Sequence, residues 1–338
     1  MSVPISLIVD DPAPLINVYW WHAAEHQQSD SPKHKSGEPV AQTVPVDFLR
    51  QFAEAIGRWG IRGKFSVLPY PAGLGKIGEG WPGCDGNALS LWIETVRSQV
   101  MPLMDITPEI LTHAKALDLD TFGLLDENER DWASHQTEAT LTPYIAAALR
   151  LLNEVGLGAT GVTSPWDFGK QVEDDYRLAI RRAMKQVNGR GQTWYFLHTD
   201  ARATDLRSSA VSRDGDDWLV SIVSQCGDHI WETMEKQDDS LAYVRSVADC
   251  YLTEDGGQGR LAELFHAGTP IVFHTHWQSL YSNGRRTGLR VLDELGRRIA
   301  GAWGSEVRWL KCSDLASEVA AGIHGGLAQG SDGAERRG

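Results

Sequence analysis

Short apolar runs alternate with segments whose apolar residues recur at helical spacing, and this alternation continues along most of the chain. Parallel strands need such crossover helices, so the pattern predicts an α/β fold with a parallel sheet or barrel. Strand-like runs occur at 5–9, 61–71, 101–107, 159–166, 193–200, 217–225, 269–277 and 307–312. Helical spacing predicts helices at 45–60, 87–100, 141–158, 172–187, 240–252 and 288–304.

Capping residues set the expected ends of two of these helices. Gly60 follows the first helical run, where a glycine commonly ends a helix. In the third, Thr142 is the expected N-cap, Pro143 occupies the first turn and Gly156 ends the helix. We see no Pro/Gly/Ser-rich linker in the middle of the chain, so we expect a single domain over 1–324. The small, polar residues of 325–338 predict a flexible tail.

Composition narrows the class of protein without naming a function. The formal net charge is −13, which argues against nucleic acid as the main partner because phosphate binding needs a basic surface. No apolar run approaches the roughly 18 residues of a membrane span. The N-terminus lacks the pattern of a signal peptide, so we expect a cytoplasmic protein. The 4 cysteines are scattered and form neither a zinc knuckle nor a disulfide framework.

Polar residues collect where the predicted strands end. In parallel α/β folds the carboxyl ends of the strands meet on one side, and functional groups gather there. The adjacent pair Asp10 and Asp11 ends the first strand, and two adjacent carboxylates repel each other unless a cation offsets their charge. Other strand ends carry further carboxylates and imidazoles: Glu109, His113, Asp167, His198, Asp200, His274 and His276.

Such a set of side chains suits metal-assisted hydrolysis. A divalent metal lowers the pKa of bound water and polarises a carbonyl group. Carboxylates and imidazoles are typical ligands of catalytic zinc, with one position left open for water. A second carboxylate can act as general base and a histidine as general acid.

The order of these motifs resembles that of the NodB-type polysaccharide deacetylases, whose catalytic domain is a distorted (β/α) barrel of about seven strands. The strand ending in Asp10-Asp11 is similar to the first motif of that family. The closing segment "TPIVFHTHW", its following helix and the turn "SDL" are similar to the last. The resemblance implies that Asp10 is the base, Asp11 a ligand of a divalent metal such as zinc, and His274 the acid, with His276 as the alternative.

Two motifs depart from that family. Its second motif is His-x-x-x-His, whereas this chain offers "EILTH", with Glu109 and His113, or "DWASH", with Asp131 and His135. We prefer Glu109 and His113 by position and retain His135 as a possible ligand. The third motif contains an arginine that orients the catalytic aspartate, and "TSPW" at 163–166 lacks it.

Aromatic and amide side chains near the strand ends suggest a sugar site. The chain has 13 tryptophans, and indole faces stack on sugar rings. We expect Trp166, Trp277 and Gln278 to bind substrate and Asn283 to lie near the pocket. The loop after Asp11 carries five further candidates that could line a cleft or cover the barrel: Trp20, Trp21, His22, Glu25 and His26.

Three functions fit these residues. The first is a metal-dependent carbohydrate hydrolase, by resemblance an N- or O-deacetylase of an oligo- or polysaccharide. The second is a glycoside hydrolase or other glycan-cleaving enzyme on the same barrel, in which two carboxylates act without a metal. The third is a non-catalytic glycan-binding protein. Metal content and the spacing of the carboxylates distinguish them.

Overall fold

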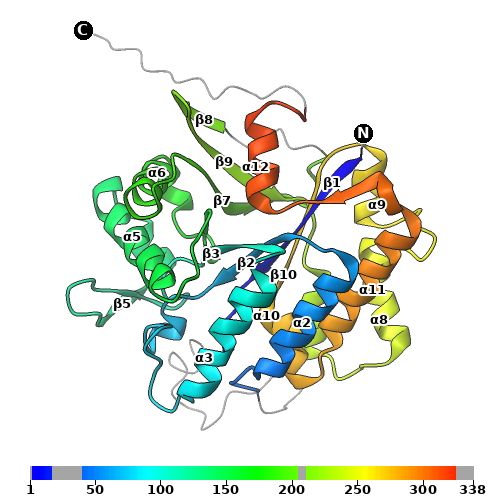
Figure 1. Ribbon diagram of the computed structural model, residues 1–338, viewed down its shortest axis with the longest axis horizontal. Helices are drawn as coiled ribbons and strands as arrows, with labels where there is room; N and C mark the ends of the chain where they lie inside the picture. Colours follow the sequence, from blue (N-terminus) through cyan, green and yellow to red (C-terminus); the bar gives the residue numbers. More distant parts are fainter. Residues whose placement is uncertain (1, 17–39, 205–210, 325–338) are drawn as a thin grey trace.

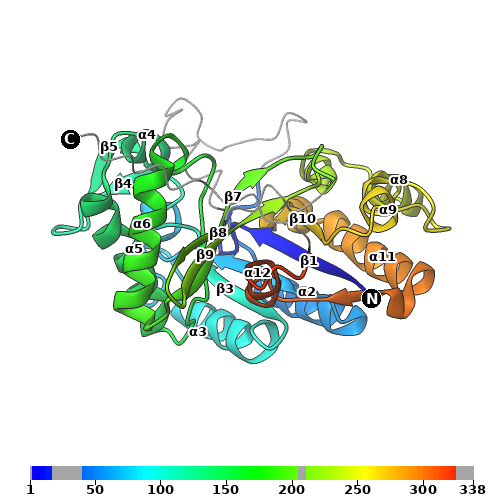
Figure 2. The ribbon, with the colours of Figure 1, turned by 90° about the horizontal axis from the view of Figure 1, so that it is seen from above.

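The computed structural model describes residues 2–16, 40–204 and 211–324, and Figures 1 and 2 show the arrangement of its helices and sheets from two sides. One sheet is entirely parallel, and its strands follow the order β10-β1-β2-β3 with β11 paired to the start of β1. Its strands are β1 (Val3–Asp10), β2 (Gly63–Val67), β3 (Met104–Pro108), β10 (Ile271–His276) and β11 (Val307–Trp309).

A second sheet has the order β6-β7-β9-β8, in which only the β8–β9 pair is antiparallel. It meets both edge strands of the first sheet, with β6 beside β3 and β9 beside β10. Ile110 N donates to Thr163 O (3.1 Å) at one junction, and Gln225 N donates to Val272 O (2.9 Å) at the other. The described strands β1, β2, β3, β6, β7, β9 and β10 therefore form a ring, called the barrel below. The bounds are β6 (Val162–Thr163), β7 (Gln192–Thr199), β8 (Val211–Asp214) and β9 (Asp217–Ser224).

Successive side chains along each strand point alternately into the barrel and out towards the helices. In β1, Leu7 and Val9 pack in the large apolar core beneath the helices, whereas Ile8 packs in a separate cluster inside the barrel. In β2, Phe65 belongs to the outer core, so its neighbours Lys64 and Ser66 face inward. The predicted class, an α/β fold with parallel strands, is confirmed by this sheet pattern.

Helices cover the outside of the barrel. Figure 1 shows α5 and α6 together along one flank and α2, α3, α8 and α11 along another. Their apolar faces form the outer core with the outward side chains of the strands. The bounds are α2 (Val46–Trp59), α3 (Gly86–Thr95), α4 (Glu129–Ala133), α5 (Glu138–Glu154), α6 (Glu173–Asn188), α7 (Glu232–Glu235), α8 (Leu241–Tyr251), α9 (Arg260–His266), α10 (Trp277–Tyr281), α11 (Thr287–Ala302) and α12 (Cys312–Ala320).

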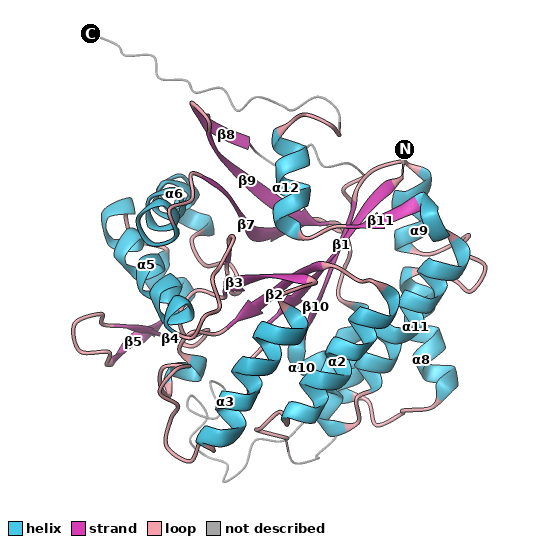
Figure 3. Cartoon of the chain, in the orientation of Figure 1, coloured by secondary structure: helices cyan, strands magenta, loops and turns pink. Residues whose placement is uncertain are grey.

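The last helix, α12, lies across the end of the barrel where the strands begin. Leu315, Ala316 and Val319 pack against Ile8 and Val272 inside the barrel. At its first turn, Ser313 donates to Asp105 of β3 through N (2.6 Å) and Oγ (3.1 Å). Figure 3 shows α12 beside β9 and β11 beside β1. Because α12 occupies this end, the opposite end of the barrel is the one open to a ligand.

The helix expected at 141–158 begins one turn earlier than predicted. It spans Glu138–Glu154, with Thr137 as N-cap in a capping box with Thr140. Thr142 is therefore inside the helix, where its hydroxyl donates to Glu138 O (2.8 Å), and Pro143 lies beyond the first turn. By contrast, α2 ends as expected, because Gly60 adopts φ 64° and caps it.

Some elements gave no sequence signal that we recognised. The hairpin of β4 (Lys115–Leu117) and β5 (Leu124–Asn128) was not predicted, because β4 is only 3 residues long and β5, "LLDEN", has no apolar alternation. The short helices α4, α7, α9, α10 and α12 and the strand β8 were not predicted either. Among the described residues, no helix is long and apolar enough to cross a membrane. The predicted tail at 325–338 lies outside the described residues.

Candidate active site

The carboxyl ends of the barrel strands surround a cavity of about 400 Å³. Strand ends from both sheets contribute to it, as expected for a parallel α/β fold. Its polar groups come mainly from β1, the segment after β3, and β10. The lining consists of Asp10, Asp11, Glu109, His113, Ser164, Trp166, Phe196, Leu197, Thr199, Trp231, His274, His276 and Gln278.

Asp11, Glu109 and His113 form a compact buried cluster. One ligand atom from each lies within 4.8 Å of the others, close enough for a single cation to contact all three. Asp11 Oδ1 lies 3.0 Å from His113 Nδ1, and Gln278 Nε2 donates to Asp11 Oδ2 (2.6 Å). Glu109 Oε2 accepts a hydrogen bond from Asp11 N (2.6 Å). The preferred pair from the sequence, Glu109 and His113, is thus brought to Asp11.

The backbone around this cluster adopts conformations that side chains usually avoid. Positive φ angles occur at Asp11 (66°), His113 (49°), Trp166 (49°) and Ile110 (45°). This conformation is most costly at Ile110, because its side chain is branched at Cβ. Strained residues of this kind concentrate at functional sites, because the surrounding structure must hold them in place. The positive φ at Asp11 turns the backbone so that the carboxylates of Asp10 and Asp11 contact different partners.

A buried carboxylate, Glu129, holds the backbone of the segment that carries His113. It accepts hydrogen bonds from Thr112 N (2.9 Å), His113 N (2.7 Å) and the Tyr144 hydroxyl (2.7 Å). Burial raises its pKa to about 7 even though these donors favour the ionised form. Glu129 begins α4, so this short helix fixes the strained turn at His113.

The electrostatics of the cluster favour an additional positive charge. Burial, together with the negative charges of Asp11 and Asp10, raises the pKa of Glu109 to about 8. For His113, burial opposes the charged form, but Asp11 outweighs it and raises the pKa to about 8. Burial also opposes ionisation of Asp11, yet the charge and hydrogen bond of His113 hold its pKa well below the usual range. Near neutral pH, Glu109 and His113 therefore retain protons that a cation could displace.

Asp10 has a different environment from its neighbour Asp11. Its Oδ1 accepts a hydrogen bond from the ammonium of Lys64 and another from Ser66 Oγ (3.1 Å). Lys64 is fully buried in the barrel beneath the cavity, and Asp10 is itself 4% exposed. The two adjacent carboxylates are thus separated: Asp10 is bound to a lysine and Asp11 to a histidine.

The two histidines of β10 are held by different partners. His276 Nδ1 contacts Asp228 Oδ2 (2.8 Å), and its ring meets Trp231 edge-on at 4.8 Å. Burial lowers the pKa of His276, but the hydrogen bond and charge of Asp228 raise it to about 10. His274 Nδ1 instead contacts Ser224 Oγ (2.8 Å), and burial lowers its pKa. Asp228 therefore favours the protonated imidazole at His276, whereas burial favours the neutral imidazole at His274.

Aromatic side chains form part of the cavity lining. Trp166 is 38% exposed and lies 4.3 Å from the ring of His113, measured between ring centroids. Trp231 lies beside His276, and Phe196 packs above the ammonium of Lys64 at 4.9 Å. Exposed indole faces of this kind can stack on a ring of the substrate.

Several predicted site residues lie elsewhere. His135 is exposed and pairs with Glu127 (3.4 Å), away from the cluster, because it follows the short helix α4. Trp277 is fully buried: it packs against Phe48, Phe52 and Phe65 and donates from Nε1 to Ala13 O (3.0 Å).

Two further groups of predicted residues are not in the cavity lining. Asn283 accepts a hydrogen bond from Ala41 N (2.6 Å) instead of lining the cavity. The loop candidates Trp20, Trp21, His22, Glu25 and His26 lie outside the described residues.

The sequence analysis did not identify three residues of the site, and the sequence contains a pattern that could have revealed only two of them. Lys64 alternates with the outward-facing Phe65, so strand periodicity could have placed it inside the barrel. Asp228 follows a strand end, where the rule applied to other strands could have found it. Glu129 lies in an acidic stretch, "DENERD", in which nothing distinguishes it from its neighbours.

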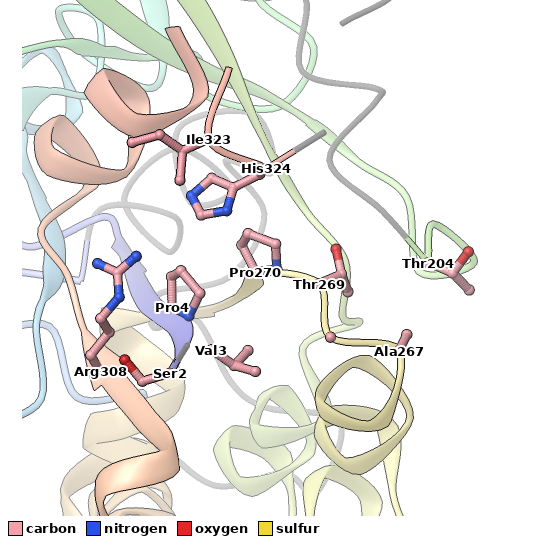
Figure 4. Close-up of a pocket in the computed structure, with 11 residues that line it drawn as sticks. Ser2, Val3, Pro4, Thr204, Ala267, Thr269, Pro270, Arg308, Ile323 and His324 are labelled. Atoms are coloured by element: carbon pink, nitrogen blue, oxygen red, sulfur yellow. The ribbon is translucent and has the colours of Figure 1, made fainter. Parts of the chain in front are cut away.

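A larger cavity of about 730 Å³ opens near the start of β1 (Figure 4). It contains no carboxylate among the described residues that line it. Its two basic side chains, Arg308 and His324, both contact Glu318, at 2.6 Å and 2.8 Å. The smaller cavity, which gathers carboxylates and imidazoles, is therefore the candidate for a catalytic site.

Comparison with known proteins supports the fold. The chain matches no protein-family model and no curated protein sequence. It aligns with the crystal structure of a "putative polysaccharide deacetylase" from Mycobacterium smegmatis at a TM-score of 0.55 and 13% identity, over 97% of this chain and 93% of that chain. The predicted class, a deacetylase-like α/β barrel fold with parallel strands, is thereby confirmed.

A second solved structure, a 4-α-glucanotransferase from Thermococcus litoralis, aligns at a TM-score of 0.46 and 11% identity. The alignment covers 94% of this chain and 40% of that chain, and a similarity this low supports no argument.

Proposed function

We propose that this protein is a metal-dependent hydrolase that removes acetyl groups from a carbohydrate. The observation that carries the proposal is the buried Asp11–Glu109–His113 cluster directly beside Asp10, in a cavity that is also lined by His276, the partner of Asp228. The fold shared with the Mycobacterium smegmatis protein, which is described as a deacetylase, supports the same class of reaction.

The cluster fits a divalent metal by donor type and by charge. Its two carboxylates and one imidazole are ligands that zinc accepts, and the pKa values near 8 of Glu109 and His113 indicate protons that a cation would replace. Asp11, Glu109 and His113 would hold the ion, and Gln278 would orient Asp11. When bound, such an ion lowers the pKa of a water ligand and polarises the acetyl carbonyl.

Asp10 is the proposed general base. It lines the cavity next to Asp11, and its contacts with Lys64 and Ser66 both use Oδ1. Oδ2 then accepts a proton from the water that attacks the acetyl carbonyl. The reaction adds this water oxygen to the carbonyl carbon and breaks the bond to the sugar nitrogen or oxygen.

His276 is the proposed general acid, rather than His274. Asp228 favours its protonated form, whereas burial favours the neutral form of His274. It is also the register partner of Asp10 across the β1–β10 pair, so base and acid lie on adjacent strands. His276 donates its proton to the departing sugar amine or hydroxyl, and acetate leaves as the second product.

The carbohydrate assignment depends on the cavity walls. Trp166 and Trp231 provide aromatic faces beside the reacting groups, and polar side chains fill the space between them. The carboxylates that line the described cavity come from β1 and the segment after β3, and the β10 side supplies histidines. A glycoside hydrolase needs two carboxylates on either side of the scissile bond, so this arrangement favours deacetylation.

The decisive experiment measures metal content and acetate release together. Zinc-loaded, untagged protein is incubated with N-acetylated chitooligosaccharides and with O-acetylated xylooligosaccharides, and both acetate and new reducing ends are quantified. We expect acetate without new reducing ends. Asp10→Asn should retain zinc and lose acetate release, whereas Asp11→Asn should lose both.

Each other outcome has a defined meaning. New reducing ends without bound metal would support the glycoside hydrolase instead. Zinc binding without turnover of either sugar would support a glycan-binding protein. Wild-type behaviour of both aspartate variants would contradict the proposal.

A further inference from the structure

Lys64 is a fully buried lysine beneath the cavity, and the reaction as described above assigns it no role. Burying an ammonium group is costly unless its charge and all of its donors are satisfied. An ammonium group has three N–H donors, and Lys64 has three acceptors. They are the Asp10 carboxylate, Ser66 Oγ (2.9 Å) and Thr163 Oγ1 (2.7 Å).

Of the carboxylates Asp10, Asp11 and Glu109, Lys64 hydrogen-bonds to Asp10, and its charge also acts on Glu109. Asp11 is bound by His113 and Gln278, and Glu109 by the backbone of Asp11. The lysine therefore does not compete with a metal for the ligand atoms of the cluster. It neutralises the carboxylate that has no place in the ligand set.

The contacts of Lys64 also restrict the orientation of Asp10. Ser66 donates to Val9 O (3.0 Å) or Asp10 Oδ1 (3.1 Å), and Thr163 is itself paired with Thr107 Oγ1 (2.9 Å). These partners come from β1, β2, β3 and β6, all of which are rigid strands of the barrel. An ammonium held from several strands gives Asp10 Oδ1 a fixed partner.

The stretch 163–166 contributes an uncharged partner to Lys64. It was identified above as lacking an arginine at the place where a cation would orient the catalytic aspartate. The structure puts Thr163 there, and its hydroxyl accepts from Lys64 instead of contacting Asp10. β3 separates β2 from β6, so Lys64 reaches Thr163 through the barrel interior, and the positive charge beside Asp10 comes from β2, the strand paired with β1.

We propose that Lys64 is the positioning residue for Asp10: it holds Oδ1 in place so that Oδ2 faces the attacking water. This inference rests on the proposed function, in which Asp10 is the base. It assigns Lys64 a role in the rate of reaction without a role in binding the sugar or the metal.

The test compares Lys64→Met with Lys311→Met in the full chain. Methionine has a similar length but no charge, and Lys311 lies near the other end of the barrel, where it donates to Met101 O (2.7 Å). For Lys64→Met we expect kcat for acetate release to fall by about 10²-fold or more, since that is the scale of a general base. KM and the zinc dissociation constant should stay within about twofold, because neither uses Lys64. Lys311→Met should match wild type.

Two measurements keep the proposal testable without turnover. Crystal structures of wild type and Lys64→Met should show the Asp10 side chain displaced in the variant, whereas an unmoved side chain would overturn the proposal. If Lys64→Met does not fold, the double variant Lys64→Met/Asp10→Asn should recover the thermal midpoint, because it removes both members of the pair. No recovery would overturn it.

The proposed function and this inference fail in different ways. Absence of acetate release by wild-type protein contradicts the function, while the crystal structures still test the position of Asp10. An active, zinc-bound Lys64→Met variant with unchanged kcat contradicts the role of Lys64 and leaves the function intact.

Discussion

The side-chain amide of Gln278 donates a hydrogen bond of 2.6 Å to Oδ2 of Asp11, a residue 267 positions earlier in the chain. Gln278 is only 3% exposed, because it lies in the short helix α10 directly after β10. The bond leaves Asp11 Oδ1 facing His113 Nδ1 at 3.0 Å. A late segment of the sequence thus orients a carboxylate that ends the first strand.

Gln278→Leu tests this relationship. Leucine keeps the volume but removes the donor, so Asp11 loses the partner that fixes its orientation. We expect the zinc dissociation constant to rise by about 10- to 100-fold, the usual effect of losing such a partner. Gln136→Leu is the matched control, because its amide donates to Trp132 O (3.0 Å) far from the cluster. Competition titration with a chromophoric chelator measures both, and equal affinities would remove Gln278 from the site.

His113→Ala and His135→Ala separate the two candidate ligand pairs. His113 belongs to the buried cluster, whereas His135 is exposed and contacts Glu127. We expect purified wild type and His135→Ala to hold about one equivalent of zinc and His113→Ala to hold none, since two ligands rarely suffice. Mass spectrometry of the metal content after dialysis decides. Loss of zinc in His135→Ala would instead support the alternative pair, Asp131 and His135, as ligands.

Zinc affinity should depend strongly on pH. Glu109 and His113 both have pKa values of about 8, so both carry protons below that pH, and a metal must displace them. Affinity should therefore rise with increasing pH up to about 8 and level off above it. Calorimetry in buffers of different ionisation enthalpy should detect up to about two protons released near neutral pH. Binding that is independent of pH would mean that these two residues are not the ligands.

Asp228→Asn should change how stability depends on pH. The pKa of His276 is raised from 6.5 to about 10. A histidine with a raised pKa stabilises the fold fully below its unfolded value and loses this contribution as the pH rises through the folded value. Wild type should therefore exceed Asp228→Asn in thermal midpoint at about pH 6.5, and the difference should shrink towards pH 10. A constant difference across this range would indicate that the His276–Asp228 pair is not charged.

Trp166→Ala tests the aromatic wall. Trp166 is 38% exposed in the cavity, so its removal should raise KM several-fold while the thermal midpoint changes little. Trp277→Phe is the contrasting variant, because Trp277 is buried among three phenylalanines. It should lower the thermal midpoint and leave KM close to wild type. The opposite result would exchange the roles of the two tryptophans.

Much of the fold was predictable because alternation and strand-end chemistry are local signals. The run ending at Asp10 and the helix capped by Gly60 appear where the pattern put them. The strand-end rule also brought together Asp11, which follows β1, and Glu109 and His113, which both follow β3. These predictions needed only the period of a strand and the direction of parallel strands.

The remaining features depend on tertiary contacts. Trp277 follows the strand-end histidines, and no local pattern shows that its indole turns into the core while Gln278 turns into the site. Thr137 rather than Thr142 caps α5, because the capping box uses Thr140 and tolerates Pro143 farther along. The contact of Lys64 with Asp10 joins two strands, and it depends on the register of the β1–β2 pair, in which Ile8 lies opposite Lys64.

The pairing of β1 with β10 and β11 has a consequence for synthesis of the chain. Among the described strands, β1 is synthesised first, yet its partners β10 and β11 start at Ile271 and Val307. Until they emerge, one edge of this apolar strand has no native neighbour, and such edges invite wrong pairings. Nascent chains halted before β10 should therefore bind chaperones and be cleaved readily by proteases, whereas chains that include α12 should resist.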